Sequence, residues 1–261
     1  MKSAVFERQQ GQADLALKTV STALSKYPKF AKLYMIQGQI HQAAKDYSAA
    51  RAAYAAGLKA VPKDITLWVL ASRLEEADGK SIRARALIEK ARLVNPKSDV
   101  LWAEAVGIEE RSGASAQAKA LLARALQECP SSGTLWSLAI WAEARPQRKA
   151  RSVDALKKCA DDALVICTVA RLFWAERKIE KARQWFERAV GAGPRGIGDA
   201  WGWWLRFERQ HGSAAQVEDV AARCAAAEPH HGATWQAIAK DDANRGKSTR
   251  ELLELVTAAL Q

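Results

Sequence analysis

Few side chains in this sequence have the type and spacing that catalysis requires. The 261 residues contain four histidines and no phosphate-binding GxxxxGK, nucleophile GxSxG or zinc-binding HExxH motif. His230 and His231 are adjacent after Pro229, in a turn where neighbouring side chains diverge, which disfavours a shared metal ion. We therefore predict a protein that is not an enzyme and that binds no cofactor and no metal.

The cysteines also lack a chemical pattern. Cys129, Cys159, Cys167 and Cys224 are separated by 30, 8 and 57 residues, which fits neither a metal knuckle nor a small disulfide framework. We interpret them as reduced thiols of the core, as in a cytosolic or nuclear protein.

One set of carboxylates does recur, seven residues after a tryptophan in each case. Its members are Glu75, Glu109, Glu143 and Glu208. Basic residues recur eleven residues before a proline or its substitute, namely Arg51, Arg85, Lys119, Lys149 and Arg183, while Glu218 takes this position later in the chain. The simplest interpretation is one structural ion pair inside each repeat, such as Glu75 with Arg85 and Glu109 with Lys119.

These columns belong to a repeat of about 34 residues. Prolines stand at Pro28, Pro62, Pro96, Pro130, Pro194 and Pro229, and an aromatic residue follows each by six or seven positions: Tyr34, Trp68, Trp102, Trp136, Trp201 and Trp235. A fixed period predicts stacked supersecondary units, with these aromatic residues in the core. The predicted repeats are 1–28 (partial), 29–62, 63–96, 97–130, 131–160, 161–194, 195–229 and 230–261.

The composition predicts that each repeat is a pair of helices, A and B. Helix-forming residues dominate, and small residues recur within each repeat, as at Ala84 and Ala91. These two are seven positions apart and therefore share one helix face, where another helix can cross closely. The opening residues 5–11 resemble residues 206–212, the end of a helix A, so we expect a fragment of a longer solenoid. The predicted fold is an all-α, right-handed superhelical α-solenoid of about seven helix pairs with a partial N-terminal repeat, in one domain over residues 1–261.

The order of the columns resembles that of tetratricopeptide repeats. The acidic column replaces the tyrosine usual in that family, and this substitution resembles half-a-TPR (HAT) repeats, which are concentrated in RNA-processing complexes. The segments ALQECPSSGTLW, AEARPQRK and SVDALKKC within residues 121–159, followed by LFWAERK at 172–178, resemble the C-terminal part of the pre-mRNA-processing factor 6 family. The resemblance extends over roughly residues 30–245.

The tetratricopeptide resemblance also implies a binding groove. In that geometry, residues five and nine positions after the tryptophan point into the concave face. The candidate groove residues are Arg73, Arg111, Trp141, Arg145, Arg171, Arg206 and Lys240, and Trp174 lies outside the core column. Because the chain carries a net charge of +11, several arginines in one column also fit an ordinary solvated face, so both interpretations stay open.

The family resemblance implies a nuclear scaffold of pre-mRNA splicing, which bridges U5 and U4/U6 snRNP proteins in the tri-snRNP. The basic column, with Trp141 and Trp174 available for stacking, supports direct RNA binding in another RNA-processing complex as the alternative. A peptide-clamp co-chaperone is the third possibility, and the acidic column counts against it. No membrane and no small-molecule substrate are expected.

Overall fold

The computed structural model describes residues 5, 7, 11–192 and 196–260. Pro194 and most of the opening fragment, residues 5–11, lie outside the described residues. The described helices are α2 (Ala13–Lys26), α3 (Ala31–Ala43), α4 (Tyr47–Ala60), α5 (Ile65–Ala77), α6 (Ser81–Val94), α7 (Asp99–Arg111), α8 (Ser115–Glu128), α9 (Gly133–Ala142), α10 (Arg148–Lys158), α11 (Ala163–Ala175), α12 (Ile179–Gly191), α13 (Gly198–His211), α14 (Ala214–Ala227), α15 (Ala233–Ala239) and α16 (Thr249–Ala259).

The all-α solenoid of helix pairs is confirmed. Each full repeat delimited in the sequence holds one pair, from α3 with α4 to α15 with α16, and α2 occupies the partial repeat. No strand forms among the described residues, where Ile197 and His231 make an isolated bridge. The same residues include no helix long and apolar enough to cross a membrane. The repeat boundaries and the right-handed superhelix stay predictions.

Short polar side chains begin the A helices. Asp64 and Ser98 accept hydrogen bonds from the backbone N–H groups of Leu67 and Leu101, and Ser132 and Asp162 cap α9 and α11 in the same way. Gly79 and Gly113 end the A helices with positive φ angles, 72° and 76°. These residues fix the helix boundaries locally.

The spacing from proline to tryptophan has a direct structural cause. The indole N–H groups of Trp68, Trp102 and Trp136 donate hydrogen bonds to the carbonyl oxygens of Pro62, Pro96 and Pro130, at 2.7, 3.3 and 2.9 Å. The Tyr34 hydroxyl donates to the Pro28 carbonyl in the same way, at 2.9 Å. Trp201, the one member spaced seven residues after its proline, has a buried indole nitrogen with no partner. The six-residue spacing therefore gives the proline carbonyl in the turn a hydrogen-bond donor and the buried indole N–H an acceptor.

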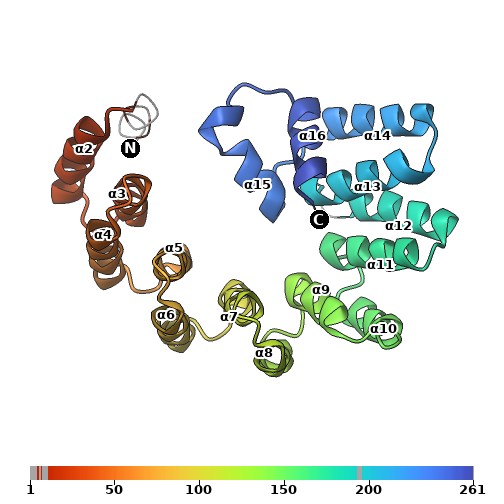
Figure 1. The fold of residues 1–261 in the computed structure, drawn as a ribbon, viewed down its shortest axis with the longest axis horizontal. Helices are drawn as coiled ribbons and strands as arrows, with labels where there is room; N and C mark the ends of the chain where they lie inside the picture. The colour runs from red at the N-terminus through yellow and green to blue at the C-terminus, as the bar shows by residue number, and fades with distance from the viewer. Residues whose placement is uncertain (1–4, 6, 8–10, 193–195, 261) are drawn as a thin grey trace. The chain divides into compact units, whose positions relative to one another are not determined.

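The chain divides into two compact units, residues 1–129 and 130–261. In unit 1, the A helices α3, α5 and α7 lie along one side and the B helices α4, α6 and α8 along the other (Figure 1). The small-residue column lies at the seams between them: Ala50, Ala84 and Ala91 are fully buried. A Cβ added at Gly57 would lie 2.7 Å from Cβ of Tyr34, so this crossing requires glycine.

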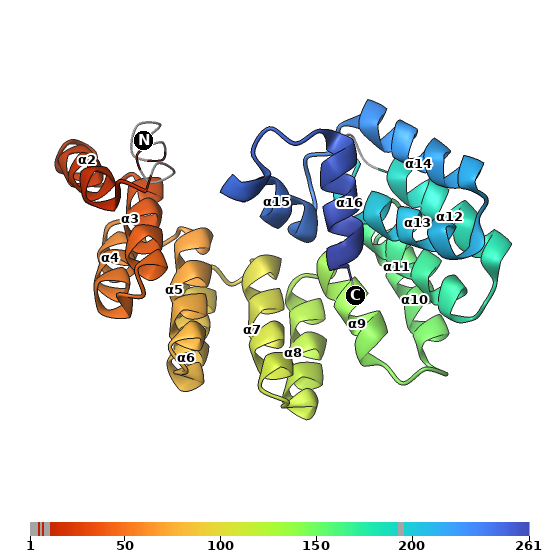
Figure 2. The same cartoon turned by 45° about the horizontal axis from the view of Figure 1, so that its top comes forward.

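In unit 2, helices α11 to α16 surround one continuous core, which includes Ile166, Phe186 and Phe207, and Leu156 of α10 packs against it. The last pair departs from the repeat. Helix α15 has seven residues, a 3-10 turn (Asp242–Asn244) follows, and α16 packs against α13 and α14 as well as α15 (Figure 2). The two helices of this last pair are thus joined by a longer connection than in the preceding repeats.

Candidate partner-binding surface

The ion pairs of the acidic column connect neighbouring repeats. Glu75 accepts from Arg51 of the preceding helix B at 2.5 Å, and Glu109 accepts from Arg85 at 2.7 Å. The predicted pairing within a repeat, Glu75 with Arg85 and Glu109 with Lys119, is therefore wrong. The packing of α5 explains the correction. Leu74, the neighbour of Glu75, packs against α4, so this part of α5 faces the preceding helix B.

The corrected pairing also accounts for Glu208. This carboxylate is 1% exposed and accepts from Arg183 of the preceding helix B, with Nε–Oε1 at 2.7 Å and Nη2–Oε2 at 3.0 Å. The Trp204 indole donates to the same carboxylate at 3.1 Å. The hydrogen bond to Glu208 is the main reason that the pKa of Arg183 is raised. Glu218 instead pairs with Arg250 at the surface, at 2.6 Å.

The short repeat replaces the ion pair with backbone contacts. Helix α9 ends at Ala142, and Arg148 donates to the carbonyl oxygens of Glu143 and Trp141 at 3.0 and 3.2 Å. Lys149, which the repeat pattern placed in this role, is exposed. A guanidinium thus closes the shortened turn around Pro146.

The aromatic column lies in the core. Trp68, Trp102, Trp136, Trp201 and Trp235 are all buried, and Tyr34 is half-buried. The Tyr34 ring lies against Gly57, and the Trp235 ring lies against Gly198. These side chains are consequently unavailable as a partner surface.

The candidate groove residues of unit 1 are neutralised. Arg73 donates to Glu104, with Nη2–Oε2 at 2.7 Å, and Arg111 donates to both Glu104 at 2.9 Å and Glu76 at 2.8 Å. Glu104 is 7% exposed, so its carboxylate is buried between these two arginines. Two arginines thus balance two glutamates, and an unpaired basic ladder does not extend through unit 1.

In unit 2 the same column builds a stack of tryptophan and arginine side chains. The Arg171 guanidinium lies between two indoles, 3.6 Å from the centroid of Trp203 and 4.7 Å from that of Trp141. Arg206 lies 5.7 Å from Trp203 on the same helix, and Arg148 lies 4.9 Å from Trp141. Each contact falls within the range of cation–π attraction.

The electrostatic environment of Arg171 differs from that of Arg73. Among the described residues of unit 2, no carboxylate forms an ion pair with Arg171 or Arg206. Burial lowers the pKa of Arg171, and the charge of Arg206 lowers it further. This end of unit 2 therefore holds two neighbouring cations without a counter-ion.

Trp174 is a packing residue. Its indole N–H donates to Nε2 of His211 at 2.9 Å, and its ring meets Phe186, Phe207 and Trp203 edge-on. These contacts leave little of the ring free for base stacking. Trp174 therefore lines the smaller hollow described below while most of its ring packs against neighbouring aromatic side chains.

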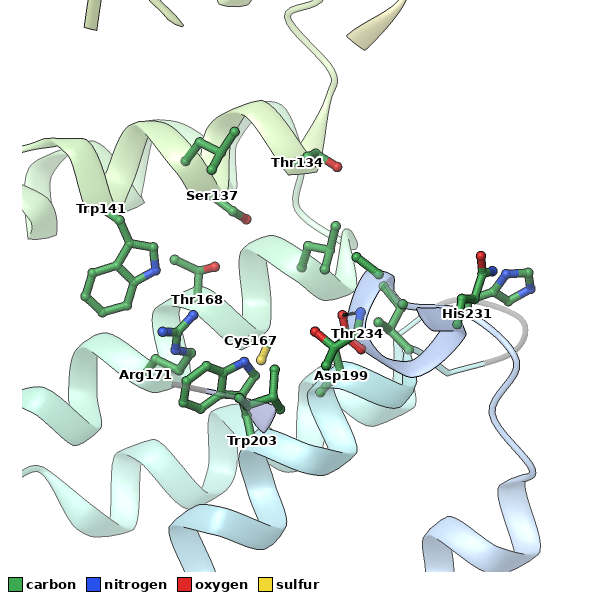
Figure 3. Close-up of a pocket in the computed structure, with 18 of the residues that line it drawn as sticks. Thr134, Ser137, Trp141, Cys167, Thr168, Arg171, Asp199, Trp203, His231 and Thr234 are labelled. Carbon is green, nitrogen blue, oxygen red and sulfur yellow. Dashed lines mark hydrogen bonds between the residues drawn. The ribbon is translucent and has the colours of Figure 1, made fainter. Parts of the chain in front are cut away.

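Two adjoining hollows follow this face of unit 2, and we call them together the tryptophan–arginine groove. The larger, about 720 Å³, is lined by α9, α11, α13, the start of α15 and the end of α16, and the smaller, about 310 Å³, shares Trp141, Arg171 and Trp203 with it. Figure 3 shows these three side chains at one end and Asp199, Thr234 and His231 at the other. Leu138, Leu164 and Ile197 contribute apolar surface to the larger hollow.

The polar lining also contains two side chains that the repeat pattern did not predict, Ser137 and Asp199. Ser137 Oγ and Trp141 Nε1 are one turn apart on α9, and neither has a hydrogen-bond partner. Asp199 lies in the first turn of α13 and accepts from the backbone N–H groups of Thr234 and Trp235, at 3.1 and 2.7 Å. Burial raises the pKa of Asp199.

The remaining candidate residues lie at the margins. Arg145 donates to the carbonyl oxygen of Ala175 at 3.3 Å and is exposed, and it does not line either hollow. Lys240 follows α15 and is also exposed, donating to Gln236 at 3.2 Å. The structure therefore brings together Trp141, Arg171 and Arg206, with Trp174 beside them.

The buried cysteines are free thiols. Cys167 lies on the groove wall, and burial raises its pKa and that of Cys224 to about 12. Such thiols are protonated and unreactive at neutral pH. In the part of the chain that the structure describes, no three His, Cys, Asp or Glu residues gather as metal ligands.

The fold defines a class, that of α-helical repeat proteins built from stacked helix pairs. A Parabacteroides merdae tetratricopeptide repeat protein is similar, with 14% identity and a TM-score of 0.48 over 98% of this chain and 96% of that one. Pseudomonas aeruginosa pilF has 14% identity and a TM-score of 0.47, over 74% of this chain and 89% of its own. No family model matches the chain.

Within this class, the chain contains a region like that of pre-mRNA-processing factor 6. Over 116 residues, 44% of the chain, it is 49% identical to the human protein of that name. It is 50% identical to Arabidopsis thaliana STABILIZED1 over 115 residues and 44% identical to Schizosaccharomyces pombe pre-mRNA-splicing factor prp1 over 114 residues. The match is shorter than the predicted span of residues 30–245, and it covers 11–12% of these three relatives' lengths.

Proposed function

We propose that this chain acts in the nucleus as part of a non-catalytic scaffold of pre-mRNA splicing. The supporting observation is its 44–50% identity to three proteins whose names place them in pre-mRNA processing or splicing. The finer proposal, from the resemblance to the same family, is that the chain helps to bridge U5 and U4/U6 snRNP proteins in the tri-snRNP.

The interactions between repeats suit a scaffold. The pairs Arg51–Glu75 and Arg85–Glu109 each connect one helix pair to the next in unit 1, and Arg183–Glu208 does so in unit 2. Bidentate guanidinium–carboxylate geometry restricts the rotation of one repeat against its neighbour. Binding sites along such helices keep a fixed spacing, which a bridging protein requires.

A pull-down from nuclear extract tests this proposal. The tagged chain is expected to retain U5 and U4/U6 snRNP proteins, identified by mass spectrometry, whereas a variant destabilised by Trp102→Ala is expected to retain less of them. Recovery of heat-shock proteins alone with the intact chain would contradict a splicing role.

Direct RNA binding is a second candidate, favoured by the formal net charge of +11. It predicts that the logarithm of the binding constant for single-stranded RNA falls by about 0.7 per phosphate contact and per tenfold increase in salt. A binding constant that is insensitive to salt would remove this candidate.

A further inference from the structure

We propose that the tryptophan–arginine groove binds an extended segment of a partner protein, in which an acidic side chain next to large apolar ones contacts Arg171 and Arg206. The inference deepens the proposed scaffold function and rests on it for the nature of the partner. The proposed peptide site lies entirely within unit 2.

The first step is charge. Arg171 and Arg206 are adjacent cations without a carboxylate partner in the described part of unit 2, whereas Arg73 and Arg111, from the same columns of the repeat, already contact Glu104. A partly buried guanidinium without a counter-ion is poorly solvated, so a carboxylate that reaches it gains a charge-assisted hydrogen bond. The end of the groove that holds Arg171 and Arg206 therefore favours an acidic side chain of the partner.

The second step is shape and polarity. The groove passes over α9, α11 and α13 to the start of α15, and helices packed side by side are about 10 Å apart. A strand rises about 3.3 Å per residue, so roughly nine residues of extended chain would span it. Leu138, Leu164 and Ile197 also line the larger hollow, which suits apolar side chains.

The third step is hydrogen bonding. Trp141 Nε1 and Ser137 Oγ have no partner in the free chain, and Figure 3 shows the Trp141 indole nitrogen turned toward Arg171 and Thr168. An unpaired buried donor destabilises the free state, and a peptide carbonyl supplies the missing acceptor. Because both atoms are buried, a movement of side chains in the groove wall must accompany binding.

The same geometry disfavours RNA in this groove. Base stacking needs a free aromatic face, yet Arg171 lies between Trp141 and Trp203, and Trp174 packs against the rings of Phe186 and Phe207. The Asp199 carboxylate at the far end also repels phosphates. A peptide whose acidic side chain lies at the Arg171 end and whose remaining side chains are apolar avoids both obstacles.

The experiment selects binders from a displayed library of random peptides with the full chain as bait. Enriched peptides are expected to combine Asp or Glu with large apolar residues. The best one, labelled and followed by fluorescence anisotropy at about 0.15 M salt, should bind at least about tenfold more weakly to Arg171→Gln, because a charge-assisted hydrogen bond is lost. Arg171→Lys, which keeps the charge and loses the flat stacking group, should be intermediate.

The matched control is Arg73→Gln, at the same repeat position in unit 1, which should leave peptide affinity unchanged. Circular dichroism melts establish that each variant is folded, and if Arg171→Gln is not, Arg206→Gln at the groove margin takes its place with the same expected loss. Enrichment of non-acidic peptides, equal affinity of the folded variants, or binding of a uridine oligonucleotide through Arg171 in place of the peptide would overturn the proposal. Peptide binding without recovery of snRNP proteins would instead reject the splicing function and leave the site intact.

Discussion

Replacing Trp102 by alanine is expected to lower the free energy of unfolding by about 3–5 kcal/mol, the usual cost of removing a large buried aromatic side chain. Trp102 is 5% exposed, and its indole N–H contacts the Pro96 carbonyl at 3.3 Å. Arg92 of the preceding repeat stacks on the ring, 3.7 Å from its centroid. The substitution therefore removes both core volume and a contact between repeats, measurable by urea denaturation followed by circular dichroism.

Two controls separate these contributions. Trp102→Phe keeps a ring in the core and loses the hydrogen bond to Pro96, so a smaller cost of about 1–2 kcal/mol is expected. Trp141→Ala should also cost less than Trp102→Ala, because Trp141 is half-buried beside the groove. Equal losses for Trp102→Ala and Trp141→Ala would contradict the assignment of one to the core and the other to the groove.

Replacing Arg183 by methionine should be similarly costly, about 3–5 kcal/mol, because it leaves the buried Glu208 carboxylate without its counter-ion. The double variant Arg183→Met/Glu208→Leu should recover much of this loss, since both charges leave the interior together. Thermal and urea unfolding of the two variants measure the difference.

The comparison for Arg183 is Arg250→Met, which removes an ion pair to Glu218 whose two side chains are 49% and 65% exposed. Exposed pairs contribute about 0–1 kcal/mol, so this substitution should be nearly silent. A similar small loss from Arg183→Met would show that the pair between repeats does not hold Glu208 in the core.

The helices were predictable because their signals are local and repeated. Proline, tryptophan and small residues recur at a fixed period, and the contact from Trp68 to the Pro62 carbonyl shows why one spacing is kept. Capping residues such as Asp64 and Ser98 act within one helical turn. Local chemistry of this kind can be interpreted without knowing how helices pack.

The ion pairs were not predictable, because a helix B lies between two A helices. Arg85 is near Glu75 in sequence, yet it contacts Glu109, and the choice depends on which helix face turns toward which neighbour. The same limit applies to Arg73 and Glu104, 31 residues apart with no shared motif. Only the packed structure shows which arginines of the column have no carboxylate partner.

The groove was predictable in part. The tetratricopeptide resemblance placed Trp141, Arg171 and Arg206 on one face, and the structure brings them together. Trp203 is absent from the predicted columns, although its two-residue spacing from Trp201 was a usable signal. The irregular last pair was missed, because Gly246 stands eleven residues after Trp235, as Gly79 does after Trp68, and so predicts a regular turn.

Sedimentation of purified U5 and U4/U6 particles with and without this chain tests the scaffold proposal most directly. If the chain bridges them, adding it should move proteins of both particles into one faster-sedimenting complex, and the proteins should stay bound to the chain after nuclease treatment. If both particles sediment at unchanged positions and neither retains the chain, it does not join them, and the scaffold proposal is wrong.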